Sequence, residues 1–192
     1  MVQFATTGIT LPFPTWMKVL ELGGGERPSF HPNMDCRWEP QVDIVADLNW
    51  PLPVPDESYD GVYTRFVLEH ISWRKARQLI SEVHRILRPG GLAVITTANL
   101  EEQCKLALQW FQESKTFEQI SEMIFGSQEF GHSWDAGSHH CGFSKQTITK
   151  TLKEASFYKV EIIPIETFPG IFTDMTALAW KSGVRITGVA ST

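Results

Sequence analysis

The sequence has few cysteines and no long run of apolar residues. Its three cysteines, Cys36, Cys104 and Cys141, are odd in number and far apart, which predicts free thiols rather than a disulfide framework. No stretch of about 18 apolar residues is present, so we expect no membrane-spanning helix and no membrane partner. The first residues lack a basic start followed by a long apolar segment. We therefore expect no signal peptide and a cytoplasmic protein.

Positive charge is also scarce. The chain carries 17 Lys and Arg against 22 Asp and Glu, which gives a formal net charge of −5. Its longest basic cluster is Arg74-Lys75-Ala76-Arg77, which is explained more simply as the solvated face of a helix. Because phosphate binding usually needs a basic surface, we expect that nucleic acid is not the partner.

Internal repeats and low-complexity segments are absent from the 192 residues, of which 42% are hydrophobic. These values predict one globular domain over residues 1–192. Apolar runs bounded by turn residues predict seven strands, at 18–22, 33–36, 42–46, 59–66, 92–97, 159–165 and 175–180.

Helices are predicted between most of these strands. The clearest begins after Ser72, has apolar residues at three- and four-residue spacing, and is stopped by Pro89-Gly90-Gly91. Further helices are predicted over 101–113, over 116–125 with a capping box, and after Ser144. Alternating strands and helices predict an α/β, Rossmann-like three-layer sandwich. Its mostly parallel seven-stranded sheet would end in an antiparallel edge hairpin made by the last two strands.

A glycine-rich loop follows the first predicted strand, in Val-Leu-Glu-Leu-Gly-Gly-Gly over residues 19–25. At the carboxyl end of the first strand of an open α/β sheet, such a loop is a place for a nucleotide-like cofactor. The nicotinamide fingerprint fails because Pro28 stands where its third glycine is needed, and the phosphate-binding loop motif is absent. A cofactor without a pyrophosphate fits better. The alternative is a tight turn that only joins strand to helix.

Two carboxylates follow the next two strands. Asp35 ends the second strand, where a carboxylate can accept both hydroxyls of a ribose. Asp47 ends the third strand and can accept a hydrogen bond from an adenine amino group. Taken alone, each has a simpler explanation: Asp35 as a solvated strand end, and Asp47 as a cap on the proline-rich turn that follows it.

Four segments in order resemble the class I S-adenosylmethionine-dependent methyltransferases. They are Val19 to Gly25, the run from Ala46-Asp47-Leu48 to Ser58-Tyr59-Asp60, Val67-Leu68-Glu69-His70, and Leu87-Arg88-Pro89-Gly90-Gly91. The resemblance covers residues 18–100 well and is closest to the small-molecule, type 11-like branch. The sequence departs from the pattern at Arg27, where many members have a third glycine, and at Pro28 and Pro32, which shorten the first helix.

This resemblance implies S-adenosylmethionine as the cofactor. Glu21 and the glycine loop would lie by its methionine part, Asp35 at its ribose and Asp47 at its adenine. The full set of cofactor-binding residues that it implies is Glu21, Gly23, Gly24, Gly25, Asp35, Asp47, Leu48, Arg65 and Phe66.

Residues 100–143 are predicted to be an insertion that forms a substrate lid. Within it, residues 126–143 hold four glycines and three histidines. His132, His139, His140 and Cys141 match no common zinc spacing, so we assign no metal site. A neutral imidazole can serve as a general base, and we expect His140 in this role, with His70 as the second candidate. The simpler explanation is that these histidines hydrogen-bond the backbone.

The sequence thus predicts an S-adenosylmethionine-dependent methyltransferase that acts on the hydroxyl or amine of a small molecule, such as a sugar, lipid or natural product. The alternatives are a protein or RNA methyltransferase, and an inactive cofactor-binding fold that acts as a partner subunit. The short arm before the first strand also leaves open a homodimer in which a second subunit completes the substrate pocket.

Overall fold

The architecture is taken from a computed structural model, which describes residues 12–113, 116–128, 137–166 and 173–183. Seven strands form one sheet in the order β3-β2-β1-β4-β5-β7-β6. The strands are β1 (Val19–Leu22), β2 (Asn33–Asp35), β3 (Ile44–Val45), β4 (Tyr59–Arg65), β5 (Leu87–Ala98), β6 (Lys159–Ile165) and β7 (Asp174–Trp180).

The first five strands pair in parallel, and β7 runs antiparallel to both β5 and β6. This confirms the mostly parallel seven-stranded sheet with an antiparallel hairpin at its edge. All seven strands lie within about two residues of their predicted positions, except that β3 is shorter and β5 begins five residues earlier.

The helices are η1 (Leu68–His70), α1 (Trp73–Ile86), α2 (Leu100–Gln112), α3 (Phe117–Phe125) and α4 (Lys145–Glu154). The capping box predicted at Thr116 and Gln119 is present at the start of α3. Ser144 forms a second capping box, with Thr147, at the start of α4. These side chains accept backbone N–H groups that the first helical turn leaves without partners, which is why both helices begin where they do.

Two segments that contain proline bear on where helices were predicted to form and end. No helix forms between β1 and β2, where Pro28 and Pro32 interrupt the backbone N–H series that a helix needs. Pro89-Gly90-Gly91 lies inside β5 instead of separating helix from strand, because α1 already ends at Ile86. The pairing of β4 with β5 shifts register between Tyr59 and Gly61, which accommodates this irregular start of β5.

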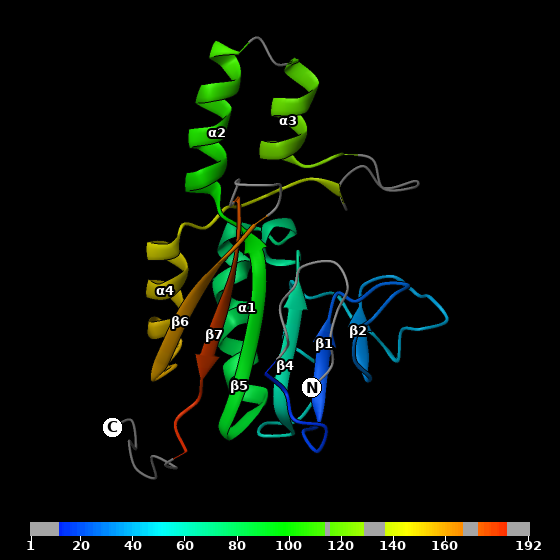
Figure 1. The fold of residues 1–192 in the computed structure, drawn as a ribbon. Helices are drawn as coiled ribbons and strands as arrows, with labels where there is room; N and C mark the ends of the chain where they lie inside the picture. Colours follow the sequence, from blue (N-terminus) through cyan, green and yellow to red (C-terminus); the bar gives the residue numbers. More distant parts are fainter. Residues whose placement is uncertain (1–11, 114–115, 129–136, 167–172, 184–192) are drawn as a thin grey trace.

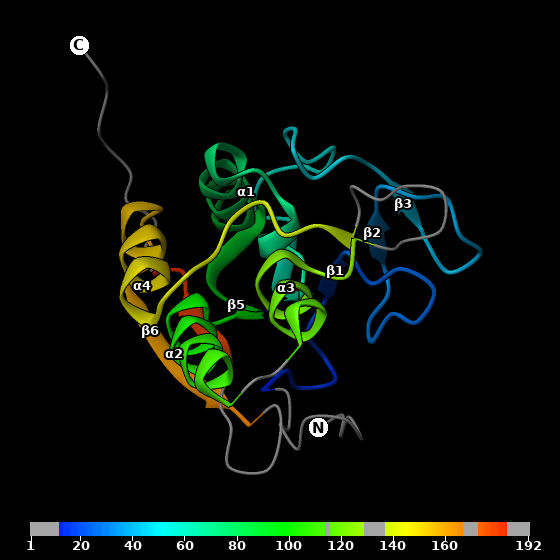
Figure 2. The same ribbon diagram turned by 90° about the horizontal axis from the view of Figure 1, so that it is seen from above.

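Helices α1 and α4 pack side by side on one face of the sheet (Figure 2). Their apolar residues, Leu79, Ile80 and Ile148 among them, join the strands in the main hydrophobic core. On the opposite face the described residues include no covering helix; there Phe13 and Phe30 lie close to Tyr63. Helices α2 and α3 project beyond the carboxyl ends of the parallel strands (Figure 1).

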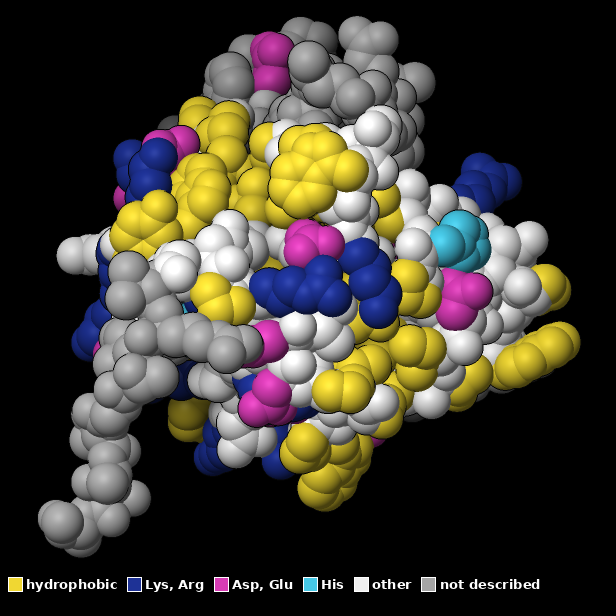
Figure 3. Space-filling view, turned by 90° about the horizontal axis from the view of Figure 1, so that it is seen from below, with side chains coloured by type: hydrophobic (Ala, Val, Ile, Leu, Met, Phe, Trp, Pro, Cys, Tyr) yellow, Lys and Arg dark blue, Asp and Glu magenta, His cyan; other side chains and the backbone are white. Residues whose placement is uncertain are grey.

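The amino-terminal ends of the parallel strands form a mixed surface. Seen from that side, basic and acidic side chains lie next to one another (Figure 3). Arg88 pairs with Asp60 at 2.8 Å and Arg85 with Asp56 at 2.7 Å. Within the described part of the chain, no helix is both long and apolar enough to span a bilayer.

Candidate functional site

The candidate site lies at the edge of the sheet where β1, β2, β4 and β5 end. The chain runs outward from β1 through β2 to β3, and then returns to place β4 and β5 on the other side of β1. In open α/β sheets, the point where the strand order reverses is where ligands bind. Here that point lies between β1 and β4, beside the glycine loop.

The second strand anchors the glycine loop. The Asn33 side chain accepts the Gly24 N–H at 3.0 Å and donates to the Gly25 carbonyl at 3.1 Å. Asp35 accepts the Gly25 N–H at 3.1 Å. Asn33 is fully buried, so the loop is held by a fixed polar partner rather than by water. Sequence reasoning missed Asn33; its position two residues before Asp35, on the same face of β2, was the available signal.

The segment that follows β4 packs closely against the glycine loop. Gly23 has a φ of +72°, a conformation that side chains other than glycine rarely adopt. A Cβ at this position would overlap the Cγ2 of Val67. Glycine is therefore required at residue 23 both for the turn and for the close approach of the segment after β4.

Glu21, at the end of β1, is buried and supports the loop. Its Oε2 accepts the backbone N–H groups of Ser29 and Phe30 at 2.5 and 2.7 Å. Burial raises the pKa of Glu21 from 4.5 to about 7, although these two donors act in the opposite direction. In this structure Glu21 therefore shapes the segment after the glycine loop; the expected contact with a cofactor stays a prediction.

The raised pKa of Glu21 makes stability depend on pH. Because the folded state holds the proton more tightly than the unfolded chain, the stabilisation is complete below about pH 4.5 and is lost as the pH rises towards 7. A shift from 4.5 to about 7 corresponds to at most about 3 kcal/mol. In urea unfolding at pH 5 and pH 8, we expect the wild type to lose more stability with rising pH than Glu21→Gln. The exposed Glu118→Gln should behave like the wild type, and equal pH dependence in all three would contradict the assignment.

Asp35 is buried at the end of β2 with its carboxylate at the site. One oxygen accepts the Gly25 N–H and the other accepts the Arg37 N–H at 3.0 Å. The Nε of Arg37 lies 3.6 Å from the same carboxylate. A carboxylate offers about four acceptor positions, so these two backbone contacts leave capacity for a pair of hydroxyls.

Asp47 is exposed and binds its own turn. Its Oδ1 accepts both the backbone N–H and the side-chain amide of Asn49, each at 2.9 Å. This is the capping role that the sequence left open as an alternative to adenine binding. The adjacent Leu48 is buried in the main core, with 6% of its surface exposed.

Arg65 is the last residue of β4, and Phe66 follows it at the same edge. The Phe66 N–H donates to the Thr96 carbonyl, and φ at Phe66 is +54°. The Arg65 guanidinium lies 5.7 Å from the centre of the Phe66 ring. This turn presents an exposed cation and a half-buried aromatic ring near Glu21, whose pKa Arg65 lowers.

A second group of polar side chains lies at the ends of β4 and β5. Glu69, on η1, is 2% exposed, and its Oε2 accepts the Thr97 hydroxyl at 3.0 Å. The rings of His70 and His139 meet edge to face at 5.1 Å. One possible ligand atom from each of Glu69, His70 and His139 lies within 4.8 Å of the other two. Burial raises the pKa of Glu69 and lowers the pKa of both imidazoles.

The expected general base His140 lies next to this group. It is exposed, and its backbone N–H donates to the Glu69 carbonyl at 2.7 Å. The Cys141 thiol donates to the Leu68 carbonyl, and burial raises its pKa to about 12, so it stays protonated. His140 and His70, the two candidate bases, therefore lie in the same part of the structure. His132 lies outside the described residues.

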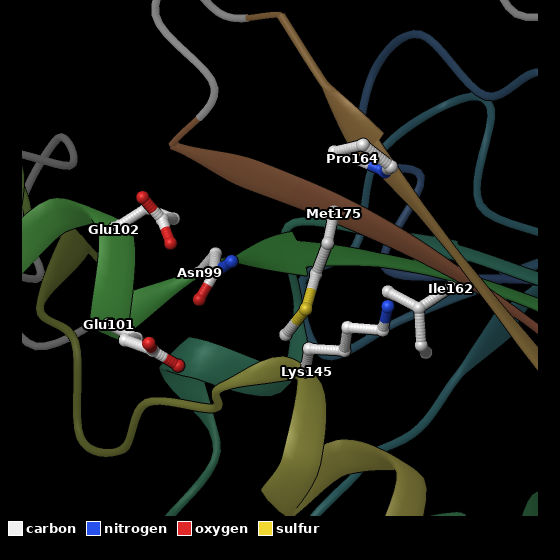
Figure 4. Close-up of a pocket in the computed structure, with 7 residues that line it drawn as sticks. All are labelled: Asn99, Glu101, Glu102, Lys145, Ile162, Pro164 and Met175. Atoms are coloured by element: carbon white, nitrogen blue, oxygen red, sulfur yellow. The ribbon is translucent and has the colours of Figure 1, made fainter.

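A separate hollow opens where β5 ends, between the first turns of α2 and α4 (Figure 4). It is lined by Asn99, Glu101, Glu102, Lys145, Ile162, Pro164 and Met175. The buried Oδ1 of Asn99 has no hydrogen-bond partner among the described residues. None of the residues predicted to bind cofactor or to act in catalysis lines this hollow.

Comparisons with known proteins agree with this geometry. A family model described as a methyltransferase domain matches residues 31–95. Over 60 residues the chain is 45% identical to an S-adenosylmethionine-dependent methyltransferase of Mycolicibacterium smegmatis. This alignment covers 31% of this chain and 23% of that protein. Over 63 residues it is 30% identical to the demethylmenaquinone methyltransferase of Lysinibacillus sphaericus, covering 33% and 26%. The match therefore spans about a quarter of the length of these curated relatives.

A solved structure extends the likeness to most of the fold. It is the 1,6-didemethyltoxoflavin N1-methyltransferase of Burkholderia thailandensis, solved with its substrate and S-adenosylhomocysteine bound. The TM-score is 0.58 at 15% identity, and the alignment covers 86% of this chain and 71% of that one. Residues 31–95 thus resemble S-adenosylmethionine-dependent methyltransferases in sequence, and most of the chain resembles one in fold. The Rossmann-like fold predicted from the sequence is confirmed. The expected cofactor, S-adenosylmethionine, agrees with the S-adenosylhomocysteine bound in that solved neighbour.

The glycine loop and Asp35 bear on the expected cofactor. Gly23 leaves no room for a side chain next to Val67, so the loop consists of backbone alone at this position. The role of Asp35 as the acceptor for a ribose diol stays a prediction. The family model covers Asp35, Asp47 and the segment after β4 but not the glycine loop itself, which the structure adds.

Proposed function

We propose that this chain transfers a methyl group from S-adenosylmethionine to a hydroxyl or amine of a small molecule. One observation carries the proposal: the glycine loop with Asp35 and the group around Glu69 and His70 lie at the same edge of the sheet, on strands β2, β1, β4 and β5. A cofactor held by the first set would present its methyl group towards the second. The named acceptors of the two relatives reported above, demethylmenaquinone and 1,6-didemethyltoxoflavin, support a small-molecule acceptor.

Methyl transfer needs orientation first and a base second. The cofactor supplies an electrophilic methyl group, so the protein mainly aligns donor and acceptor, which can contribute roughly 7–11 kcal/mol. Where the acceptor must lose a proton, a positioned base adds about 10²–10⁴-fold. We assign this base to His140, because its side chain is exposed and its backbone N–H places it beside Glu69 at this edge of the sheet.

The acceptor class is tested with labelled cofactor. We expect methyl-labelled S-adenosylmethionine to transfer its label into the low-mass fraction of a cell extract and not into purified RNA or protein fractions. A net charge of −5 agrees with that outcome. Label found only in RNA or protein would replace the small-molecule proposal. Tight binding of S-adenosylhomocysteine without any transfer would identify an inactive partner subunit instead.

A further inference from the structure

Glu69, His70 and His139 come from two distant segments that are fixed against each other. The Ser138 carbonyl accepts from His70 Nδ1 at 3.0 Å. The Glu69 carbonyl accepts the backbone N–H groups of His140 and Cys141 at 2.7 and 3.2 Å. On its other side, His139 is held to the end of α3 by its backbone N–H, which donates to the Phe125 carbonyl at 2.9 Å. The three side chains therefore converge on a built framework.

The hydrogen bonds also fix which nitrogen of each imidazole is protonated. His70 Nδ1 and His139 Nδ1 each lie within hydrogen-bond distance of a backbone carbonyl, at 3.0 and 3.2 Å. A carbonyl only accepts, so each Nδ1 carries the proton and each Nε2 keeps its lone pair. A ring that donates Nδ1–H to a carbonyl and offers Nε2 is the arrangement found for histidines that bind metals.

Glu69 is the third candidate metal ligand, and its carboxylate supplies the negative charge. It is 2% exposed and accepts the Thr97 hydroxyl. Within the described part of the chain, no cationic side chain forms an ion pair with it. A buried carboxylate is stable in its charged form only when a partner or a metal balances it.

We propose that Glu69, His70 and His139 bind one divalent transition-metal ion that holds the oxygen of the methyl acceptor. Ligand atoms bound at about 2.0–2.2 Å to one ion stand roughly 3–4 Å apart. The present spacing of at most 4.8 Å therefore needs only a small contraction. Two imidazoles and one carboxylate suit ions such as Zn²⁺, Fe²⁺ or Mn²⁺. Cys141 is outside the set, since its thiol donates to Leu68.

This inference rests on the proposed function for the identity of the bound oxygen. Three protein ligands leave coordination positions open, as in catalytic metal sites. A hydroxyl bound there loses its proton more easily, and His140 accepts that proton. The oxygen then forms a bond to the methyl carbon while the carbon–sulfur bond breaks and its electron pair stays on sulfur. The products are the methylated oxygen, S-adenosylhomocysteine and one proton, with no change of oxidation state.

Binding of Co²⁺ alone, without cofactor or acceptor, tests the site directly. Untagged protein titrated with Co²⁺ should show visible d–d absorption that saturates at one ion per chain. Loss of a residue that only hydrogen-bonds a metal ligand weakens metal sites by about 10–100-fold, so removal of a ligand itself should weaken binding by at least about a hundredfold. We expect this for His139→Ala and for the isosteric Glu69→Gln.

Two variants serve as controls. His140→Ala removes the neighbouring exposed imidazole. His31→Ala removes an imidazole that is paired with Asp43 at 2.7 Å, just before β2, and β1 and β4 lie between β2 and β5 in the sheet. Both should keep the absorption and the stoichiometry. Circular dichroism and S-adenosylhomocysteine binding report whether His139→Ala and Glu69→Gln are folded.

Co²⁺ binding that is absent from the wild type, or that survives in folded Glu69→Gln and His139→Ala, would overturn the metal site. Failure of the methyltransferase proposal looks different, because it would show as absent S-adenosylhomocysteine binding or absent methyl transfer with Co²⁺ binding intact. If metal binds and labelled methyl groups are transferred only to nitrogen or carbon, the site stands and the oxygen acceptor is wrong.

Discussion

His140→Ala is expected to lower the turnover of the proposed methyl transfer by about 10²–10⁴-fold, the usual contribution of a positioned base. The affinity for S-adenosylhomocysteine should stay within a few-fold, because the cofactor loop is anchored by Asn33 and Asp35 and not by this segment. The substitution removes the imidazole without removing a backbone contact of the segment. The backbone N–H of His140, which holds the segment to Glu69, remains in the alanine variant.

The measurement is a comparison of kcat with cofactor affinity in matched variants. His31→Ala should retain wild-type turnover, since His31 is exposed at the start of β2 and binds Asp43. Full activity in His140→Ala together with a loss in His70→Ala that leaves Co²⁺ binding intact would transfer the role of base to His70. Wild-type activity in both variants would mean that methyl transfer proceeds by alignment of the reactants alone.

The parts of the fold that the sequence predicted correctly are those decided by local patterns. Apolar runs located all seven strands, and the pair Thr116 and Gln119 identified the start of α3 by its capping box. Each of these signals lies within a few residues, so the chain needs no distant contact to reveal it. Asp35 was likewise placed at the end of the second strand, and it is the last residue of β2.

The candidate site was less accessible from the sequence because its contacts join distant segments. His70 and Ser138 are 68 positions apart and Glu69 and Thr97 are 28 apart, yet both pairs are hydrogen-bonded. In the histidine-rich loop alone, His132, His139, His140 and Cys141 match no common zinc spacing. Glu69 and His70, which form the proposed ligand set together with His139, come instead from the segment after β4.

Two residues expected to bind the cofactor already make local hydrogen bonds, and their cofactor contacts stay predictions. Asp47 looked equally suited to adenine and to a turn, and in the structure Asn49 takes its Oδ1. Glu21 looked like a cofactor residue, but two backbone N–H groups already occupy its Oε2. Side chains that cap neighbouring backbone and side chains that bind ligands use the same oxygens, so residue type and position alone do not separate the two roles.

Asp35→Ala should weaken binding of S-adenosylmethionine and of its demethylated product at least tenfold. The variant loses the acceptor for two ribose hydroxyls, and hydrogen bonds to a charged group contribute roughly 1.5–3 kcal/mol each. It also loses the acceptor for the Gly25 and Arg37 N–H groups, so part of the effect comes through the loop. Titration calorimetry measures the change in Kd.

Asp35→Asn separates these two contributions. Asparagine keeps one carbonyl oxygen, which can hold the Gly25 N–H, but its amide nitrogen donates where the carboxylate accepted. If the carboxylate binds the ribose, Asp35→Asn should lose affinity nearly as strongly as Asp35→Ala while unfolding at a urea concentration close to that of the wild type. If Asp35 only anchors the loop, Asp35→Asn should bind almost as well as the wild type.

Asp47→Ala gives the comparison at the neighbouring strand. The Asp47 carboxylate is exposed and holds Asn49, so we expect a smaller loss of cofactor affinity than at Asp35. Equal affinities for the wild type and a folded Asp35→Ala would remove Asp35 from the cofactor site.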